Sequence, residues 1–301
     1  MKKSVALVLS SGGSRGVAHI GVIDELIEQG YNITSISGTS MGALVGGMYA
    51  SGELKIFEKW MCSLSKYDVF KLVDFTLSLN GIVKGTKVLK EMKNIVPDRQ
   101  IEDLKIPFIC IATDIVNGKE VVFENGSLYD AIRASISIPT VFMPFEKNGL
   151  KLVDGGVLNP LPIDKIKRND NDILIVVNVN SDKEYIKLAK ENVLAELNAS
   201  QTNYLSKIQH RINDIIPINK RDKLGYYNLL NNTTSLMIQK ISQLTIEKYK
   251  PDIIIEIPKK SFGTYEFYKS EEIIKLGIKA TKKALIKYHK NLESTKTQQS
   301  I

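Results

Sequence analysis

The sequence of 301 residues predicts an α/β fold, with a mainly parallel central sheet covered by helices and a helical insertion or cap in the C-terminal half. Two consecutive units of strand, turn and helix occupy residues 5–30 and 32–52. Apolar, β-prone runs then recur between helical segments as far as residue 180. Because parallel strands need long crossover connections, this alternation is typical of a sheet with helices packed on its faces.

The individual elements follow from apolar spacing and from the residues that interrupt it. The apolar run 5–9 ends at a cluster of serine and glycine, after which apolar residues recur at helical spacing until Gly30. The run 32–37 is β-prone, and the small-residue helix after it is closed by Gly52. Further strands are expected at 106–115, 119–126, 149–154 and 171–180, with a helix at 128–137 that ends before Pro139.

The chain is expected to form one domain, because no linker rich in proline, glycine or serine divides it. Its core is predicted at 4–165, its continuation at 166–290 and a flexible polar tail at 291–301. Within the continuation we expect strands near 172–180 and 252–257, a polar helical region at 183–250 and a closing helix at 271–289.

The composition is that of an ordinary globular protein, with 43% hydrophobic and 25% charged residues. The first apolar run is shorter than the ~7–15 residues of a signal-peptide core, and no run reaches the ~18 apolar residues of a membrane span. Cys62 and Cys110 have no histidine at ligand spacing, so we expect reduced core residues and neither a disulfide nor a metal site. These features predict a cytoplasmic protein, with peripheral attachment to a membrane left open.

The net charge of +8 is concentrated in the C-terminal third, where Lys259, Lys260, Lys282 and Lys283 lie. Such residues are typical of a solvated helix face, and they also suit a surface that attracts anionic lipid. Aromatic residues are not interleaved with this basic sequence, so nothing indicates a nucleic-acid partner.

Ser40 lies in a G-x-S-x-G pattern between a β-prone run and a helix. On a sharp strand-to-helix turn, neighbouring backbones come too close for side chains, which explains glycine at Gly38 and Gly42. The helix that follows would direct its positive dipole end toward charge developing at the serine. Alone, the pattern fits either a nucleophile or a flexible joint.

The loop 10–19, SSGGSRGVAH, favours the nucleophile. A phosphate-binding P-loop would require lysine after Gly16, where Val17 stands. A dinucleotide site would require glycine at Ser11 and an acidic residue at Ser37. Consecutive glycines beside the serine turn can instead direct several backbone N–H groups at one point, as an oxyanion hole does. Its predicted residues are Gly12, Gly13, Ser14 and Arg15, with Gly16 as support.

The catalytic base of such a nucleophile is usually histidine, but His19 falls inside the first helix and His210 and His289 lie in polar helical stretches. A Ser-His-Asp triad on an α/β-hydrolase fold needs several strands before the nucleophile, and Ser40 follows only the second. Asp154 is the better candidate, because it ends an apolar strand. Gly155 and Gly156 follow it and leave room for close approach to another backbone.

These three motifs, in this order, closely resemble the patatin-like phospholipase family. The resemblance covers most of residues 4–165, including ISGTSMGALVGGMYASG, DAIRASISIPTVFMPF and LVDGGVLNPLPID, and is weaker at 251–288. The sequence departs from the family's G-G-G-x-[RK]-G pattern at Ser11, which replaces the first glycine, and the region 183–250 resembles no segment of the family.

The resemblance implies a three-layer α/β/α fold and a lipid acyl hydrolase that attacks phospholipid or lysophospholipid esters without a metal or other cofactor. It assigns Ser40 as nucleophile, Asp154 as base and the loop from Gly12 to Gly16 as oxyanion hole. Two alternatives stay open: a transacylase that uses the same dyad with an alcohol acceptor, and a non-catalytic protein of this fold that binds a membrane or a partner.

Overall fold

A computed structural model describes residues 3–72, 75–78, 81–83, 86–139, 141–185 and 225–299. By compactness, the chain divides into a large unit, residues 1–183 with 238–301, and a small unit, residues 184–237. Much of the region 183–250, predicted to be helical, lies outside the described residues. Its described end forms helix α9 (Tyr226–Tyr249).

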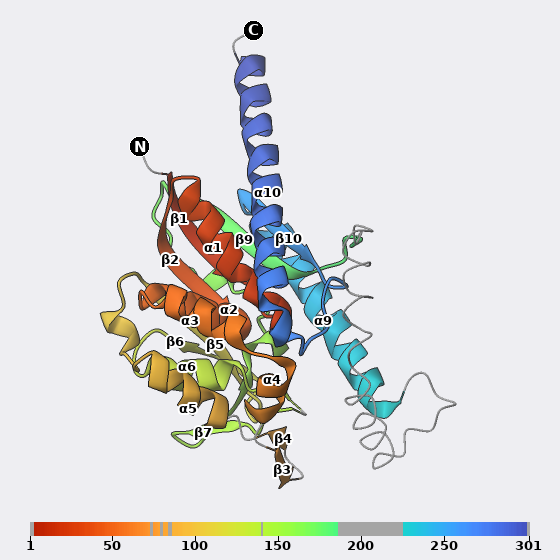
Figure 1. Cartoon of the computed structure of the whole chain (residues 1–301). Coiled ribbons are helices and arrows are strands. Elements are labelled where there is room, and N and C mark those ends of the chain that lie inside the picture. The colour runs from red at the N-terminus through yellow and green to blue at the C-terminus, as the bar shows by residue number, and fades with distance from the viewer. Residues whose placement is uncertain are drawn as a thin grey trace. The chain divides into compact units, whose positions relative to one another are not determined.

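The large unit is built on an eight-stranded sheet in the order β10-β9-β1-β2-β5-β8-β7, with β6 paired to β5 (Figure 1). Neighbouring strands from β10 through β5 are parallel. The pairs β5–β6, β5–β8 and β7–β8 are antiparallel. The predicted mainly parallel sheet is therefore confirmed. The strands are β1 (Lys3–Leu9), β2 (Tyr31–Thr39), β5 (Phe108–Asp114), β6 (Lys119–Phe123), β7 (Phe145–Lys147), β8 (Leu150–Asp154), β9 (Ile173–Ser181) and β10 (Ile253–Pro258).

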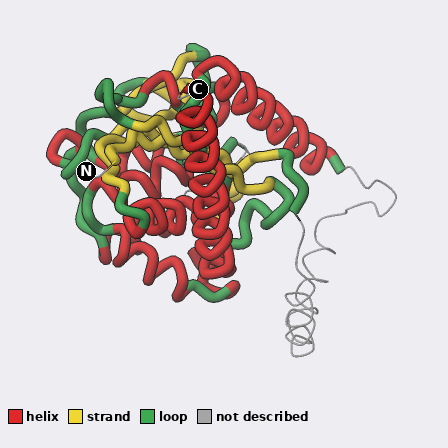
Figure 2. Tube along the Cα trace, turned by 90° about the horizontal axis from the view of Figure 1, so that it is seen from above, coloured by secondary structure: helices red, strands yellow, loops and turns green. Residues whose placement is uncertain are grey.

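Helices flank this sheet (Figure 2). The sequence analysis assigned no elements between the second predicted helix and residue 106. The described residues of this segment form three α-helices, the 3-10 turn η2 (Ile101–Asp103) and a small antiparallel hairpin. The helices are α1 (Ala18–Glu28), α2 (Met41–Ala50), α3 (Leu54–Ser63), α4 (Lys66–Leu72), α5 (Thr86–Ile95), α6 (Leu128–Ser135) and α10 (Ser270–Gln299), and the hairpin is β3 (Phe75–Ser78) and β4 (Gly81–Val83).

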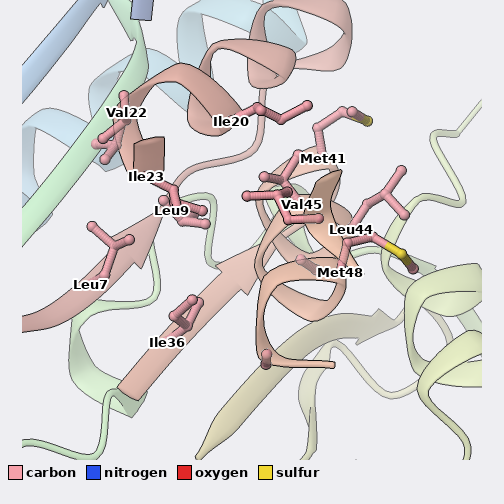
Figure 3. Packing of buried hydrophobic residues seen from close by; sticks show 14 of the residues in the cluster. Leu7, Leu9, Ile20, Val22, Ile23, Ile36, Met41, Leu44, Val45 and Met48 are labelled. Carbon is pink, nitrogen blue, oxygen red and sulfur yellow. The ribbon is translucent and has the colours of Figure 1, made fainter. Parts of the chain in front are cut away.

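The core lies on both faces of the sheet, as the alternation of side chains along β1 shows. Leu7 and Leu9 pack on one face with apolar residues of α1 and α2 (Figure 3). Ala6 and Val8 belong to a second cluster on the other face, against which Ile246 of α9 packs. A strand buried on both faces reads as a continuous apolar run, which is why β1 was recognisable from sequence.

The closing helix α10 packs against α1 through two glycines. A Cβ atom at Gly21 would lie 2.1 Å from the carbonyl oxygen of Ile274, and one at Gly277 would lie 2.1 Å from that of Ala18. The predicted end of this helix at 289 was wrong: α10 continues to Gln299, because no proline or glycine interrupts the segment after 289. No helix among the described residues is both long and apolar enough to cross a membrane.

Candidate active site

Ser40 occupies a strained turn between β2 and α2. Its φ of 57° and ψ of −124° lie outside the regions that residues other than glycine readily adopt. A Cβ atom at Gly38 would lie 2.5 Å from the Gly42 carbonyl oxygen, and one at Gly42 would lie 2.2 Å from the Leu9 carbonyl oxygen. Glycine is therefore needed at both positions if the chain is to turn this sharply and present the serine.

The hydroxyl of Ser40 donates a hydrogen bond of 2.6 Å to Oδ2 of Asp154. Both residues are buried, with exposed fractions of 3% and 6%. The other carboxylate oxygen, Oδ1, accepts a 2.7 Å hydrogen bond from the N–H of Gly156. The carboxylate is thus fixed in orientation, with one oxygen toward the backbone and the other toward the serine.

Strand register brings the two residues together. Thr39 at the end of β2 is paired with Ile111 of β5, and the next residue of β5, Ala112, is paired with Asp154. Ser40 and Asp154 therefore flank β5 at one level of the sheet. β8 runs antiparallel to β5. Its register, and not a shared strand direction, sets the position of Asp154.

Burial changes the acidity of Asp154. Desolvation raises the pKa of its carboxyl group to about 6, although the hydrogen bonds from Ser40 and Gly156 act in the opposite direction. A carboxylate with this pKa is still ionised at neutral pH and is a stronger base than an exposed aspartate.

Ser135, which the sequence analysis did not identify, supports the Ser40 turn. The backbone N–H of Ser40 donates a 2.8 Å hydrogen bond to the Ser135 hydroxyl, which in turn donates to the Ile111 carbonyl oxygen at 2.6 Å. Ser135 ends α6, so this helix links the turn to β5. No short sequence motif indicates this contact, because it depends on how α6 packs.

Gly155 and Gly156 allow close packing beside the carboxylate. A Cβ atom at Gly155 would lie 2.3 Å from the Ile111 carbonyl oxygen. One at Gly156 would lie 3.0 Å from Oδ1 of Asp154 and 3.1 Å from the hydroxyl of Ser11. The hydroxyl of Ser11 is buried and has no hydrogen-bond partner among the described residues. The backbone N–H of Ser11 donates to the carbonyl oxygen of Pro160 at 2.9 Å.

The glycine-rich loop packs directly on the serine turn. It forms a short 3-10 helix, η1 (Gly13–Val17), in which a Cβ atom at Gly16 would lie 2.4 Å from Cβ of Met41, the residue after Ser40. Gly13 has a φ of 57°, in the left-handed region that favours glycine.

The four predicted oxyanion-hole residues differ in the state of their donors. The N–H of Ser14 donates to the Thr264 carbonyl oxygen at 2.9 Å, so this group is occupied. Among the described residues, no backbone carbonyl accepts a hydrogen bond from the N–H of Gly12 or Gly13. In this respect the N–H groups of Gly12 and Gly13 differ from that of Ser14.

The side chain of Arg15 is held by β9 and by the segment after β10. Its guanidinium donates to the carbonyl oxygens of Val179 and Phe262 and to the side-chain oxygen of Asn180, at 3.1, 3.2 and 3.1 Å respectively. Burial lowers the pKa of Arg15 to about 10. The side chain thus anchors η1 to β9 and to the segment after β10.

The two described histidines, His19 and His289, make no hydrogen bond with Ser40. His19 is fully buried in α1, with Nε2 2.9 Å from the Ser10 carbonyl oxygen, and burial lowers its pKa to about 4. His289 lies on α10 with Nε2 3.4 Å from the Tyr31 hydroxyl. His210 lies outside the described residues. The two cysteines are free, Cys62 in α3 and Cys110 in β5.

The protein thus has an α/β fold with a strained serine at a strand-to-helix turn, hydrogen-bonded to a buried carboxylate. This arrangement is typical of proteins with a serine nucleophile. The family model for patatin-like phospholipase matches residues 7–166. An NTE family protein of Mycobacterium tuberculosis H37Rv is 35% identical over 91% of this chain and 89% of its own length. The chain therefore belongs to the patatin-like phospholipase family.

Two more distant similarities were found. The lysophospholipase NTE1 of Meyerozyma guilliermondii is 29% identical over 91% of this chain, which corresponds to 19% of that protein. The crystal structure of VipD from Legionella pneumophila superposes with a TM-score of 0.46 and 15% identity, covering 95% of this chain and 67% of that one.

Proposed function

We propose that this protein is a serine lipid acyl hydrolase of the phospholipase A or lysophospholipase type. The observation that carries the proposal is the 2.6 Å hydrogen bond from the strained Ser40 to the buried Asp154. Membership of the patatin-like phospholipase family and similarity to a lysophospholipase support lipid ester hydrolysis.

In the first half-reaction, Oγ of Ser40 attacks the ester carbonyl carbon while its proton passes to Oδ2 of Asp154. The oxyanion of the tetrahedral intermediate accepts hydrogen bonds from the N–H groups of Gly12 and Gly13. The intermediate collapses as the bond to the leaving oxygen breaks. Asp154 gives its proton to that oxygen, so the alcohol or lysolipid leaves with a neutral hydroxyl group.

In the second half-reaction, a water molecule attacks the acyl-enzyme and gives its proton to Asp154. Collapse of the second intermediate releases the fatty acid, and the proton returns to Oγ of Ser40. The scheme requires no metal ion. Preformed N–H donors matter most here, because they need no reorganisation when charge develops on the substrate oxygen.

Product analysis tests this function. With lysophosphatidylcholine as substrate, the expected products are free fatty acid and glycerophosphocholine in equal amounts. Addition of an alcohol or lysolipid acceptor should leave the fatty acid as the main product. If the acyl group appears mainly on the acceptor, the protein is a transacylase. If neither product forms from any lipid or short-chain ester, the hydrolase proposal fails.

A further inference from the structure

One surface of the large unit combines exposed aromatic side chains with lysines. It consists of α4 and of the segment 259–269, which includes the 3-10 turn η5 (Phe267–Lys269). The two parts are in contact, since Nζ of Lys66 lies 5.8 Å from the ring centre of Tyr268. We call this the α4–η5 surface. The residues expected to meet a ligand are Lys66, Tyr67, Lys71, Lys259, Lys260 and Tyr265.

Two tyrosines of this surface are unusually exposed. Tyr67 is 64% exposed and Tyr265 is 45% exposed, and none of the residues of α4 is buried. Nζ of Lys71 lies 4.3 Å from the ring centre of Tyr67, so a cation and an aromatic ring are presented together. Tyrosine and lysine side chains of this kind are suited to a bilayer interface, where the apolar part enters the headgroup region and the polar end stays hydrated.

Four of the five lysines of this surface form no ion pair with a described carboxylate, and only Lys269 does. Several lysines elsewhere on the described surface, such as Lys55 and Lys165, form ion pairs with carboxylates. No described carboxylate forms such a pair with Lys66, Lys71, Lys259 or Lys260. The pKa of Lys259 is lowered by burial and by the positive charges of Arg15 and Lys260. The two acidic residues within the surface are engaged locally, Asp68 with Ser65 and Glu266 with Lys269.

The α4–η5 surface is hydrogen-bonded to the candidate oxyanion loop. The hydroxyl of Ser14 donates to the Gly263 carbonyl oxygen at 2.6 Å, and its N–H donates to that of Thr264 at 2.9 Å. Arg15 donates to the carbonyl oxygen of Phe262 at 3.2 Å. A lipid bilayer in contact with segment 259–269 would therefore lie next to the loop that packs on Ser40.

We propose that the α4–η5 surface docks on bilayers that contain anionic phospholipid. The proposal rests on the proposed lipid hydrolase function and extends it by naming the surface through which the substrate is reached. Unpaired lysines supply the attraction to negative headgroups, and exposed tyrosines supply contact with the interface. Lys282 and Lys283, which the sequence grouped with Lys259 and Lys260, are not part of it. Lys282 lies 3.6 Å from the buried Glu25, between α10 and α1.

Cosedimentation with vesicles tests this docking. The Ser40→Ala protein is used, so that lipid is not consumed and binding is measured independently of catalysis. Vesicles contain either phosphatidylcholine alone or equal parts of phosphatidylcholine and phosphatidylglycerol. We expect binding to the second kind only, with a steep loss as salt is added. Lys259→Gln/Lys260→Gln should weaken this binding roughly 30-fold, the factor expected for two near-surface lysines.

The matched control is Lys283→Gln/Lys287→Gln, which removes the same charge from exposed positions of α10. At about 1.5 Å per residue, Lys283 lies about 20 Å along the helix from Ser270, toward the end that points away from α4 in Figure 1. This control should bind vesicles as the Ser40→Ala parent does. Thermal unfolding of each variant shows whether it is folded. Tyr67→Ser, on α4, tests the same surface without altering segment 259–269, and should weaken binding roughly tenfold.

Three results would overturn the proposal. The first is failure of the Ser40→Ala protein to bind the anionic vesicles, and the second is equal loss of binding in the two double variants, which would indicate non-specific charge attraction. The third is unchanged binding in folded Lys259→Gln/Lys260→Gln and Tyr67→Ser proteins, which would place docking elsewhere. None of these results bears on hydrolysis of a soluble ester, so the function and the docking surface can fail separately.

Discussion

Replacing Ser40 by alanine is expected to lower ester hydrolysis by about 10⁴–10⁶-fold, because the acyl-enzyme can no longer form. The substitution removes one oxygen atom from a turn that keeps its glycines, so the fold should persist. Initial rates with a short-chain ester, together with circular dichroism, measure both effects.

Ser51→Ala is the matched control for this substitution. Ser51 caps the other end of α2, where its hydroxyl donates to the Met48 carbonyl oxygen at 2.9 Å. The control should keep most of the activity, since its contact is local to the helix end. If the folded Ser40→Ala protein hydrolysed the ester at a rate close to that of the native protein, Ser40 would not be the nucleophile.

Replacing Asp154 by asparagine is expected to lower hydrolysis by about 10²–10⁴-fold, the usual effect of losing a general base. Asparagine preserves the shape of the side chain, but its amide cannot take the proton of Ser40. His289→Gln is the control, because His289 lies on α10, contacts Tyr31 of β2 and has no described contact with the serine. We expect this variant to keep most of the activity, and the same outcome for His210→Gln. Loss of turnover in a folded histidine variant, with Asp154→Asn active, would exclude the dyad.

The raised pKa of Asp154 predicts the pH dependence of the native protein. Only the ionised carboxylate can accept a proton, so kcat/KM should rise with pH up to about 6 and level off above it. A profile that is flat between pH 5 and pH 7 would contradict a buried base. So would a profile with its midpoint near pH 4, where an ordinary exposed aspartate titrates.

The same shift has a consequence for stability. Because the folded-state pKa of about 6 lies above the ordinary aspartate value of 3.8, the folded state favours the protonated carboxyl group. The stability linked to this group is present below pH 3.8 and is lost as pH rises through about 6. At neutral pH, the free energy of unfolding of Asp154→Asn should therefore exceed that of the native protein by up to about 3 kcal/mol. Its unfolding temperature should be correspondingly higher. The difference should shrink below pH 4.

Much of the site could be predicted from sequence because its determinants are local. A glycine on each side of Ser40 and two glycines after Asp154 are required by close backbone contacts, so they appear as short motifs. The first strand was recognisable because it is apolar on both faces. The resemblance to the patatin-like family also rests on these local segments.

The remaining features depend on long-range packing. The antiparallel direction of β8 and its register with β5 join residues 112 and 154, and no local pattern encodes such a pairing. The support of Ser40 by Ser135 depends on the position of α6. The occupied N–H of Ser14 depends on a segment after β10, far along the chain, so the sequence could not separate this donor from those of Gly12 and Gly13.

The most direct test of the Ser40–Asp154 dyad is mass mapping of the residue that a fluorophosphonate modifies. This reagent phosphonylates a serine hydroxyl that is activated by a base and lies beside oxyanion donors. We predict a single adduct, on the peptide that contains Ser40, with labelling abolished in Ser40→Ala and strongly slowed in Asp154→Asn. An adduct on another residue, or labelling that persists in Ser40→Ala, would contradict the assignment of Ser40 as the nucleophile.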